Sequence, residues 1–420
     1  MVKILKGVVR HYDWGSPTVI PHLLGLPPNG KPWAELWLGA HPTAPATVDD
    51  KPLNLLISKD PHNLLGSDIT STSKNLPFLM KVLAVEHPLS LQVHPTVEQA
   101  QEGFKREQAM GIPIDSPKRS FRDSCHKPEL VCALTSFELL CGFRDVQFTL
   151  ALLDTIHSKE LDPMRDQLRK KLSPQGLHAL VGWLLSLEKT EVAMLLNSML
   201  RVCSEIVARN VDTSPWTTDT DKTRIPADSN TEVADTSYHW QQWIRQLTTA
   251  IKLGEHYPQD AGVIVSLLLN YIILRPGEAM FLPPGTPHCY LRGSAVEVMA
   301  CSDNVVRGGL TSKHTDINTL LEVIDTTPLA IEIQQPKTTH GITTYESHAT
   351  EFSLTRIELQ SDFSTAIQSG PAILLCTNGR VQVNNLTLER GQAAWISFSE
   401  ELINLKGLGT AFVCSKDQWG

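Results

Sequence analysis

The sequence predicts a mainly β protein: two jelly-roll sandwiches, with an α-helical region inserted into the first. Alternating polar and apolar residues mark the first ~145 residues, as in 31–42, and a strand pattern returns from Gly262. Between these parts, apolar residues such as Phe148, Leu152 and Ile156 recur at helical spacing. After Asp325, short apolar runs follow at regular intervals, which is typical of a sandwich or barrel.

These patterns divide the chain into four segments. We expect residues 1–146 and 258–325 to form two parts of one jelly roll, which carries the candidate site. Residues 147–257 form the helical insertion, and residues 326–420 form the C-terminal jelly roll. A polar stretch over 211–235 is expected to be an exposed loop or locally disordered.

Composition narrows the function classes. The 420 residues carry a net charge of −8, which disfavours nucleic acid or an anionic membrane as a partner. The sequence lacks an apolar run long enough to span a membrane, and the first residues lack the apolar core of a signal peptide. The eight cysteines are scattered without a CxxC pair, as expected for reduced thiols. We therefore expect a cytoplasmic protein, and nucleotide-binding glycine motifs are absent.

Two short stretches place polar side chains on strand faces. In LSLQVHP, the residues Ser90, Gln92 and His94 have a spacing of two and project from one face of a strand. In HKPEL, Lys127 and Glu129 share a face in the same way. Burying such groups is costly without partners, so these faces indicate a site.

A third stretch, 275–313, contains a rigid corner and a cationic segment. His288 directly follows the Pro283-Pro284-Gly285 corner, and Glu297 lies on the strand expected after it. A segment broken by Gly308-Gly309 is expected to be a hinged loop, and it carries Asp303, Arg307 and Lys313. An imidazole, a carboxylate and two cations are the groups that an anionic substrate needs.

Four of these side chains suit a metal ion such as zinc, namely Gln92, His94, Glu129 and His288. A single strand histidine is more often a hydrogen-bonded core or surface residue than a ligand. For His94 and His288, the neighbouring polar groups strengthen the case for a ligand, but spacing alone leaves both interpretations open.

The chain resembles the type I mannose-6-phosphate isomerases, zinc enzymes of the cupin superfamily, over nearly its whole length. The likeness is carried by YDWGS, KPWAELWLGAHP, LSLQVHP, HKPEL, LLLNYIILRPGEAMFLPPGTPHCYLRG and VEVMACSDNVVRGGLTSK. The resemblance implies one zinc ion per chain, bound by Gln92, His94, Glu129 and His288. It also implies a catalytic Arg307, with Lys313, Ser90 and Lys127 near the sugar phosphate or hydroxyls. Asp303 and Trp14 are further candidate substrate-binding residues.

The resemblance further implies interconversion of mannose 6-phosphate and fructose 6-phosphate, in carbohydrate metabolism and GDP-mannose biosynthesis, by a monomer. Moving a proton between C2 and C1 through an enediol needs an acid–base group, and Glu297 is our candidate. On sequence alone a solvent-facing Glu297 is about equally plausible. Lys127 either acts on the ring-opening oxygen or neutralises Glu129.

Two other classes stay open: an Fe(II) cupin oxygenase and a non-catalytic sugar-binding cupin. Gln92 as a fourth ligand disfavours the first, because such iron sites prefer two histidines and one carboxylate. The sequence also departs from the family pattern at Phe121, Cys125, Cys289, Gly308 and Ser312. We expect these changes to affect rate or metal affinity rather than the reaction class.

Overall fold

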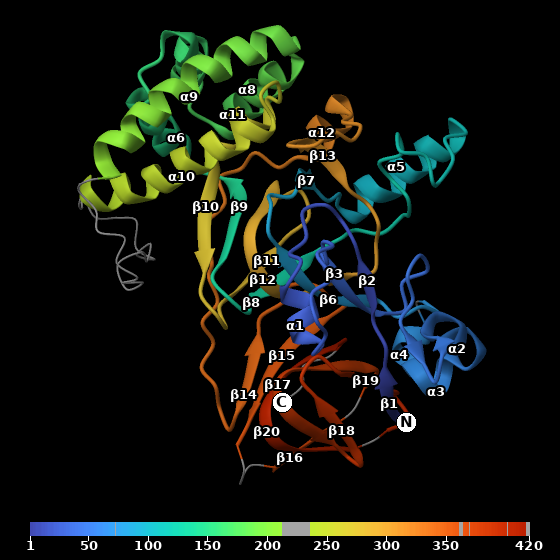
Figure 1. Cartoon of the computed structure of the whole chain (residues 1–420). Coiled ribbons are helices and arrows are strands. Elements are labelled where there is room, and N and C mark those ends of the chain that lie inside the picture. Colours follow the sequence, from blue (N-terminus) through green and yellow to red (C-terminus); the bar gives the residue numbers. More distant parts are fainter. Residues whose placement is uncertain (72, 212–235, 361–363, 369, 401, 417–420) are drawn as a thin grey trace.

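Two large antiparallel sheets and a group of helices make up the architecture (Figure 1). The computed structural model describes residues 1–71, 73–211, 236–360, 364–368, 370–400 and 402–416. The predicted fold class, mainly β with a helical insertion, is confirmed. The polar stretch predicted over 211–235 lies, from residue 212 on, outside the described residues.

The first sheet carries the candidate ligands Gln92, Glu129 and His288, and His94 directly follows its strand β7. Its main path runs β10-β9-β12-β6-β3-β2, and β7, β8, β11 and β13 pair at its side. The strands are β2 (Val8–Arg10), β3 (Glu35–Gly39), β6 (Phe78–Val85), β7 (Leu91–Val93), β8 (Glu129–Ala133), β9 (Phe137–Phe143), β10 (Leu269–Leu274), β11 (Ala279–Leu282), β12 (His288–Ala300) and β13 (Val306–Gly309). A small ribbon of β4 (Thr47–Val48) and β5 (Lys51–Pro52) stands apart.

The second sheet is built from the C-terminal region and from the first strand of the chain. Its order is β1-β19-β17-β20-β15-β14, with β16 on β20 and β18 on β17. The strands are β1 (Val2–Leu5), β14 (Ile342–Tyr345), β15 (Ser353–Leu359), β16 (Ser364–Gln368), β17 (Ala372–Val383), β18 (Leu386–Glu389), β19 (Ala393–Ile396) and β20 (Leu402–Ser415). In β1, Val2 lies opposite Ile396, so the two ends of the described chain meet in one sheet.

The predicted helical insertion is present, and it lies beyond the β9 and β10 end of the first sheet in Figure 1. It contains α6 (Val146–Thr155), the 3₁₀ helix η1 (Lys159–Leu161), α7 (Asp162–Lys170), α8 (Pro174–Ser186), α9 (Lys189–Val211), α10 (Thr236–His256) and α11 (Gly262–Ser266). Of the predicted apolar stripe, Leu152 and Ile156 are buried, whereas Phe148 is 47% exposed. In the parts of the chain that the structure describes, no helix is both long and apolar enough to cross a membrane.

The remaining helices lie outside the insertion: α1 (Val19–Leu23), α2 (Leu53–Lys59), α3 (Pro61–Leu65), α4 (Ser67–Thr70), α5 (Val97–Ala109) and α12 (Ile317–Val323). α5 begins with a capping box, in which Thr96 accepts from the amide of Gln99 and the Gln99 side chain accepts from the amide of Thr96.

Strand alternation on β12 positions the candidate site. Val296 and Val298 belong to a core that includes Trp395 and Phe412 of the C-terminal sheet. Glu297 lies between them in sequence, so its side chain takes the opposite face. The prediction that alternation turns Glu297 inward is therefore correct.

One local prediction was wrong. The segment with Gly308-Gly309 is not a free loop, because β13 pairs with β7. The register slips between Arg307 and Gly309, so the two glycines accommodate a bulge rather than a hinge.

Candidate metal centre

Three buried side chains from separate elements converge on one point. His94 follows β7, Glu129 begins β8 and His288 begins β12, and their ligand atoms all lie within 4.8 Å of one another. Nε2 of His94 lies 3.3 Å from Glu129 Oε1, and Nε2 of His288 lies 3.4 Å from Glu129 Oε2. The turn before His288 places it here: the amide of Gly285 donates to the His94 carbonyl over 2.7 Å.

Hydrogen bonds fix the tautomer of both imidazoles. Nδ1 of His94 donates to the Asn304 carbonyl over 2.7 Å, and Nδ1 of His288 donates to the Thr286 carbonyl over 3.0 Å. In its neutral form, each ring then presents the Nε2 lone pair toward Glu129. Burial, assisted by the Lys127 ammonium, lowers the pKa of His94 to about 4, which keeps its Nε2 free to bind a metal.

The arrangement fits a divalent cation. Two imidazole nitrogens and a carboxylate face one another as acceptors, which favours a cation between them. The Lys127 ammonium reaches only His94 Nε2 and Glu129 Oε1. Among the described residues, neither Glu129 Oε2 nor His288 Nε2 has a hydrogen-bond partner, although both are buried. Nitrogen and carboxylate ligands of this kind are those that zinc takes.

Lys127 balances the charge of Glu129. Its Nζ lies 2.8 Å from Glu129 Oε1 and 3.2 Å from His94 Nε2. Burial disfavours the Glu129 carboxylate, but Lys127, His94 and His288 together outweigh burial and hold the pKa of Glu129 well below its usual range.

The backbone places Gln92 and Arg307 beside this group. Gln92 lies directly opposite His288 in the β7–β12 pair, and opposite Arg307 in the β7–β13 pair. Three predicted residues on three strands are therefore adjacent in the sheet.

Glu297 lies in a buried polar row across the sheet. It is opposite Lys81 in the ladder, with its Oε2 2.9 Å from Lys81 Nζ, and it accepts from the Tyr290 hydroxyl over 2.8 Å. The Tyr290 ring in turn lies 5.8 Å from the His288 ring, centroid to centroid. Burial raises the pKa of Glu297 despite the opposing charge of Lys81, as expected for an acid–base group.

The cationic side of the site contains Arg307 and Lys313. Burial, Arg307 and the nearby Arg122 lower the pKa of Lys313. Lys313 Nζ lies 5.9 Å from the ring centre of Tyr12, and that ring stacks with Trp14 at 5.9 Å. The structure therefore brings predicted Lys313 and Trp14 to one neighbourhood through Tyr12.

Asp303 and Ser90 complete the predicted set. Asp303 Oδ1 lies 3.4 Å from Nε2 of the buried His41, and its amide donates to Asp123. Ser90 is half-buried and comes directly before β7.

Sequence reasoning missed Lys81, Tyr290 and Arg122. A signal existed for Lys81, because it interrupts the otherwise apolar run FLMKVLAV, where a buried lysine needs a partner. For Tyr290 and Arg122, only the folded arrangement reveals the neighbours.

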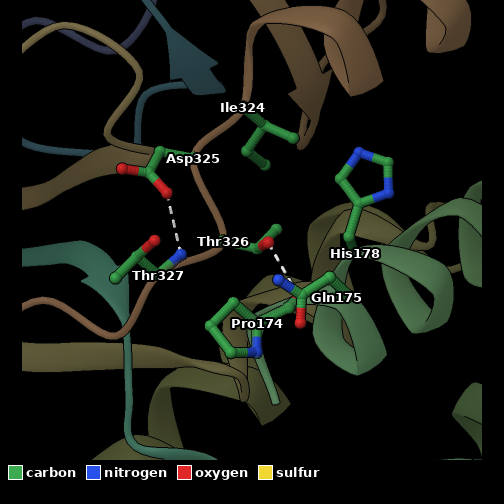
Figure 2. A pocket seen from close by; sticks show the side chains of 7 residues that line it. All are labelled: Pro174, Gln175, His178, Ile324, Asp325, Thr326 and Thr327. Atoms are coloured by element: carbon green, nitrogen blue, oxygen red, sulfur yellow. Dashed lines mark hydrogen bonds between the residues drawn. The ribbon is translucent and has the colours of Figure 1, made fainter.

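The open pocket drawn in Figure 2 is a different place. It has a volume of about 300 Å³, and its lining includes His178 of α8 and Asp325 and Thr327, which follow α12. Its lining contains none of the candidate ligands. Its link to the metal centre is indirect, since the Asp325 amide donates to the Gly285 carbonyl.

Comparisons with known proteins agree with this geometry. The family model described as "Phosphomannose isomerase type I, catalytic domain" matches residues 2–146. The mannose-6-phosphate isomerase of Escherichia coli (strain K12) is 34% identical over 97% of this chain and 98% of its own length. That of Homo sapiens is 30% identical over 95% and 94%.

Solved structures give the same result. A mannose 6-phosphate isomerase bound with zinc and yttrium superposes with a TM-score of 0.83, at 31% identity, covering 99% of this chain and 100% of that one. The Salmonella typhimurium enzyme bound to its substrate f6p and a zinc atom also gives a TM-score of 0.83, at 30% identity and the same coverage.

Fold and site together define a cupin-type metalloenzyme of the isomerase class. Specifically, the chain belongs to the type I mannose-6-phosphate isomerase family.

Proposed function

We propose that this enzyme interconverts mannose 6-phosphate and fructose 6-phosphate, with one zinc ion per chain. The observation that carries the proposal is the buried convergence of His94, Glu129 and His288, with two acceptor atoms lacking a partner among the described residues. The family supports the substrate, because the relatives carry that activity in their names.

His94, Glu129 and His288 would hold the zinc, with Gln92 as the fourth ligand, since its backbone lies opposite that of His288. When bound, zinc supplies a Lewis acid toward an oxygen of the sugar. Lys127 is buried beside two of these ligands, which supports a role in exchanging a proton with the ring oxygen during ring opening.

Glu297 is the proposed acid–base group in the isomerisation. It removes the proton from C2, the electron pair of that bond forms the C1–C2 double bond of the enediol, and O1 gains a proton. Loss of the O2 proton and delivery of a proton to C1 then give the ketose, so no oxidant is needed. Lys81 stabilises the Glu297 carboxylate between turnovers, and the Tyr290 hydroxyl holds its orientation.

Arg307 and Lys313 are proposed to bind the negative charges of the substrate. Arg307 lies nearer to the metal ligands, opposite Gln92. We therefore propose that it stabilises the negative charge that develops during the reaction, or binds a nearby oxygen of the substrate. Lys313 and Ser90 suit the phosphate, with Asp303 and Trp14 lining the same region.

A coupled assay on protein stripped of metal tests the proposal. Activity should be absent without metal, return with zinc and be lost in Arg307→Ala. The matched control is His178→Ala, a half-buried histidine that lines the separate pocket, and it should retain activity. Zinc-loaded wild type that turns over neither sugar phosphate would overturn the proposal.

The comparisons do not favour the Fe(II) oxygenase or the non-catalytic cupin. The four-segment division, a monomeric state and a cytoplasmic location stay part of the proposal. Limited proteolysis, sedimentation and cell fractionation test them in turn.

A further inference from the structure

Asp260 connects the helical insertion to the cationic side of the site. It lies in the turn between α10 and α11, far from the metal ligands in sequence. Its Oδ1 accepts from the Gly262 amide over 2.7 Å, and its Oδ2 accepts from the Thr311 amide over 3.3 Å. Burial raises the pKa of this carboxyl, and the backbone amides of Gly262, Thr311 and Leu310 oppose that rise.

The segment that Asp260 binds has an unusual backbone. Gly309 has φ +127° and the buried Leu310 has φ +55°, a region that leucine rarely adopts. The Thr311 amide, which follows this turn, donates to the Asp260 carboxylate. The protein itself therefore supplies an anion to this turn.

Close packing shows that the contact is built into the fold. A Cβ on Gly309 would lie 2.6 Å from Asp260 Oδ1 and 2.8 Å from the Cα of Gly262. A Cβ on Gly262 would lie 3.0 Å from the Cα of Gly309. Two glycines therefore allow two backbones to approach at this point, with the carboxylate between their amides.

This turn lies between the two cations of the site. Arg307 precedes it on β13, and the ladder to β7 has a bulge after Arg307 and ends at the pair of Gly309 with Leu91, so strand pairing does not fix the chain beyond Gly309. Lys313 follows it, and its amide donates to the Thr311 hydroxyl over 3.1 Å. The hydrogen bond from the Thr311 amide to Asp260 therefore fixes the backbone directly after the last strand pair.

We propose that Asp260 is a positioning residue for Arg307 and Lys313, and that the helical insertion shapes the anion-binding side of the active site through it. This inference rests on the function proposed above. Asp260 need not touch the substrate. Its effect passes through the Gly309–Thr311 backbone.

The test compares Asp260→Ala and Asp260→Asn with Asp145→Ala. Asp145 is a matched control because its carboxylate also accepts two backbone amides in the helical region, those of Gln147 and Phe148, and it caps α6. Zinc content, thermal midpoint, kcat, KM and the affinity for inorganic phosphate are measured for each zinc-loaded protein, at a temperature at which all are folded.

Asp260→Ala should lower kcat/KM by about 10²-fold, the cost of a misplacement near 1 Å, and should weaken phosphate binding while zinc content stays at the wild-type level. Asp260→Asn keeps one acceptor oxygen, so its kcat/KM and its phosphate affinity should fall less than those of Asp260→Ala. Asp145→Ala should lower the thermal midpoint only. Wild-type kcat/KM and phosphate affinity in Asp260→Ala would overturn the inference.

A double-mutant cycle separates positioning from a general loss of structure. In an Arg307→Lys background, Asp260→Ala should have a much smaller effect on kcat/KM than in wild type, because the group that it positions is already impaired. Full additivity would contradict the inference. The phosphate titration needs no turnover, so an inactive wild type would overturn the proposed reaction and still leave the role of Asp260 measurable.

Discussion

Lys127 and Glu129 form a buried ion pair of 2.8 Å, and the same ammonium lies 3.2 Å from Nε2 of His94. The Lys127 ammonium therefore lies beside two of the three donors that converge in the metal centre. Lys127 stabilises the ionised Glu129, and it also repels any metal cation that binds there.

Replacing Lys127 with methionine separates these effects, because methionine keeps an unbranched apolar stem without the charge. We expect zinc to bind more tightly in Lys127→Met, since a competing cation has been removed. Turnover should fall by about 10²-fold, a usual cost of losing a proton-transfer group. Chelator competition and kcat at saturating zinc measure the two effects. Weaker zinc binding with unchanged kcat would contradict both expectations.

Zinc should stabilise the folded protein. A ligand that binds only the folded state adds about 4 kcal/mol at a thousand times its dissociation constant, so the thermal midpoint should rise when zinc is added to stripped protein. His288→Ala should abolish most of this rise, and His178→Ala should preserve it. An equal rise in both variants would show that zinc binds elsewhere.

Replacing only one partner of the Lys81–Glu297 pair should lower the unfolding free energy strongly. Both side chains are almost fully buried, so Lys81→Met leaves an unpaired carboxylate and should cost about 3–5 kcal/mol of unfolding free energy. The double variant Lys81→Met/Glu297→Leu should recover part of that loss while remaining inactive. Urea unfolding gives the energies, and additive losses would argue against a coupled pair.

The ion pair between His126 and Glu351, at 2.6 Å, should contribute to acid stability. Burial opposes ionisation of Glu351, but the His126 hydrogen bond and charge outweigh it and lower the pKa of Glu351 below its ordinary 4.5. A carboxyl of this kind stabilises the fold above about pH 4.5, and its contribution disappears as the pH falls through the lower folded-state pKa. Glu351→Gln should therefore be less stable than wild type at neutral pH and approach it under strong acid. Denaturant titrations at several pH values check this, and a constant difference at all pH values would count against it.

Cys125 should tolerate substitution despite its place before His126-Lys127. The structure uses its backbone: its amide donates to Asp123, and its carbonyl accepts from the Asn304 side chain over 2.8 Å. The side chain itself is exposed. Cys125→Asn should change kcat/KM by no more than about twofold, the range of ordinary surface substitutions. A larger change would assign the thiol a role in the site.

The sequence predicted best those site residues whose orientation depends on a few neighbouring residues. His94, Glu129 and His288 each lie beside a short strand or a proline corner, so local pattern indicated their orientation, and all three meet in the structure. Helical spacing likewise located the insertion. These features depend on local chain geometry, which the spacing of apolar residues and the identity of turn residues indicate.

What could not be predicted depends on contacts between distant segments. Glu297 lies 216 residues from its partner Lys81, and the register that pairs them follows from the assembled sheet. The strand nature of Val306–Gly309 was missed because glycines usually indicate a loop, whereas here β7 supplies the hydrogen bonds. The Asp260 contact spans 51 residues and has no local signature.

The pairing of β1 with β19 has a consequence for the order of folding. During synthesis from the N-terminus, Val2–Leu5 is made long before its partner Ala393–Ile396. β1 must therefore stay unpaired until the C-terminal sheet has been synthesised. A fragment that starts at residue 326 would leave β19 with an open edge, prone to pairing with other chains. The two sheets thus have separate hydrogen-bond ladders, but the chain links them, because β1 belongs to the C-terminal sheet and β2 belongs to the first.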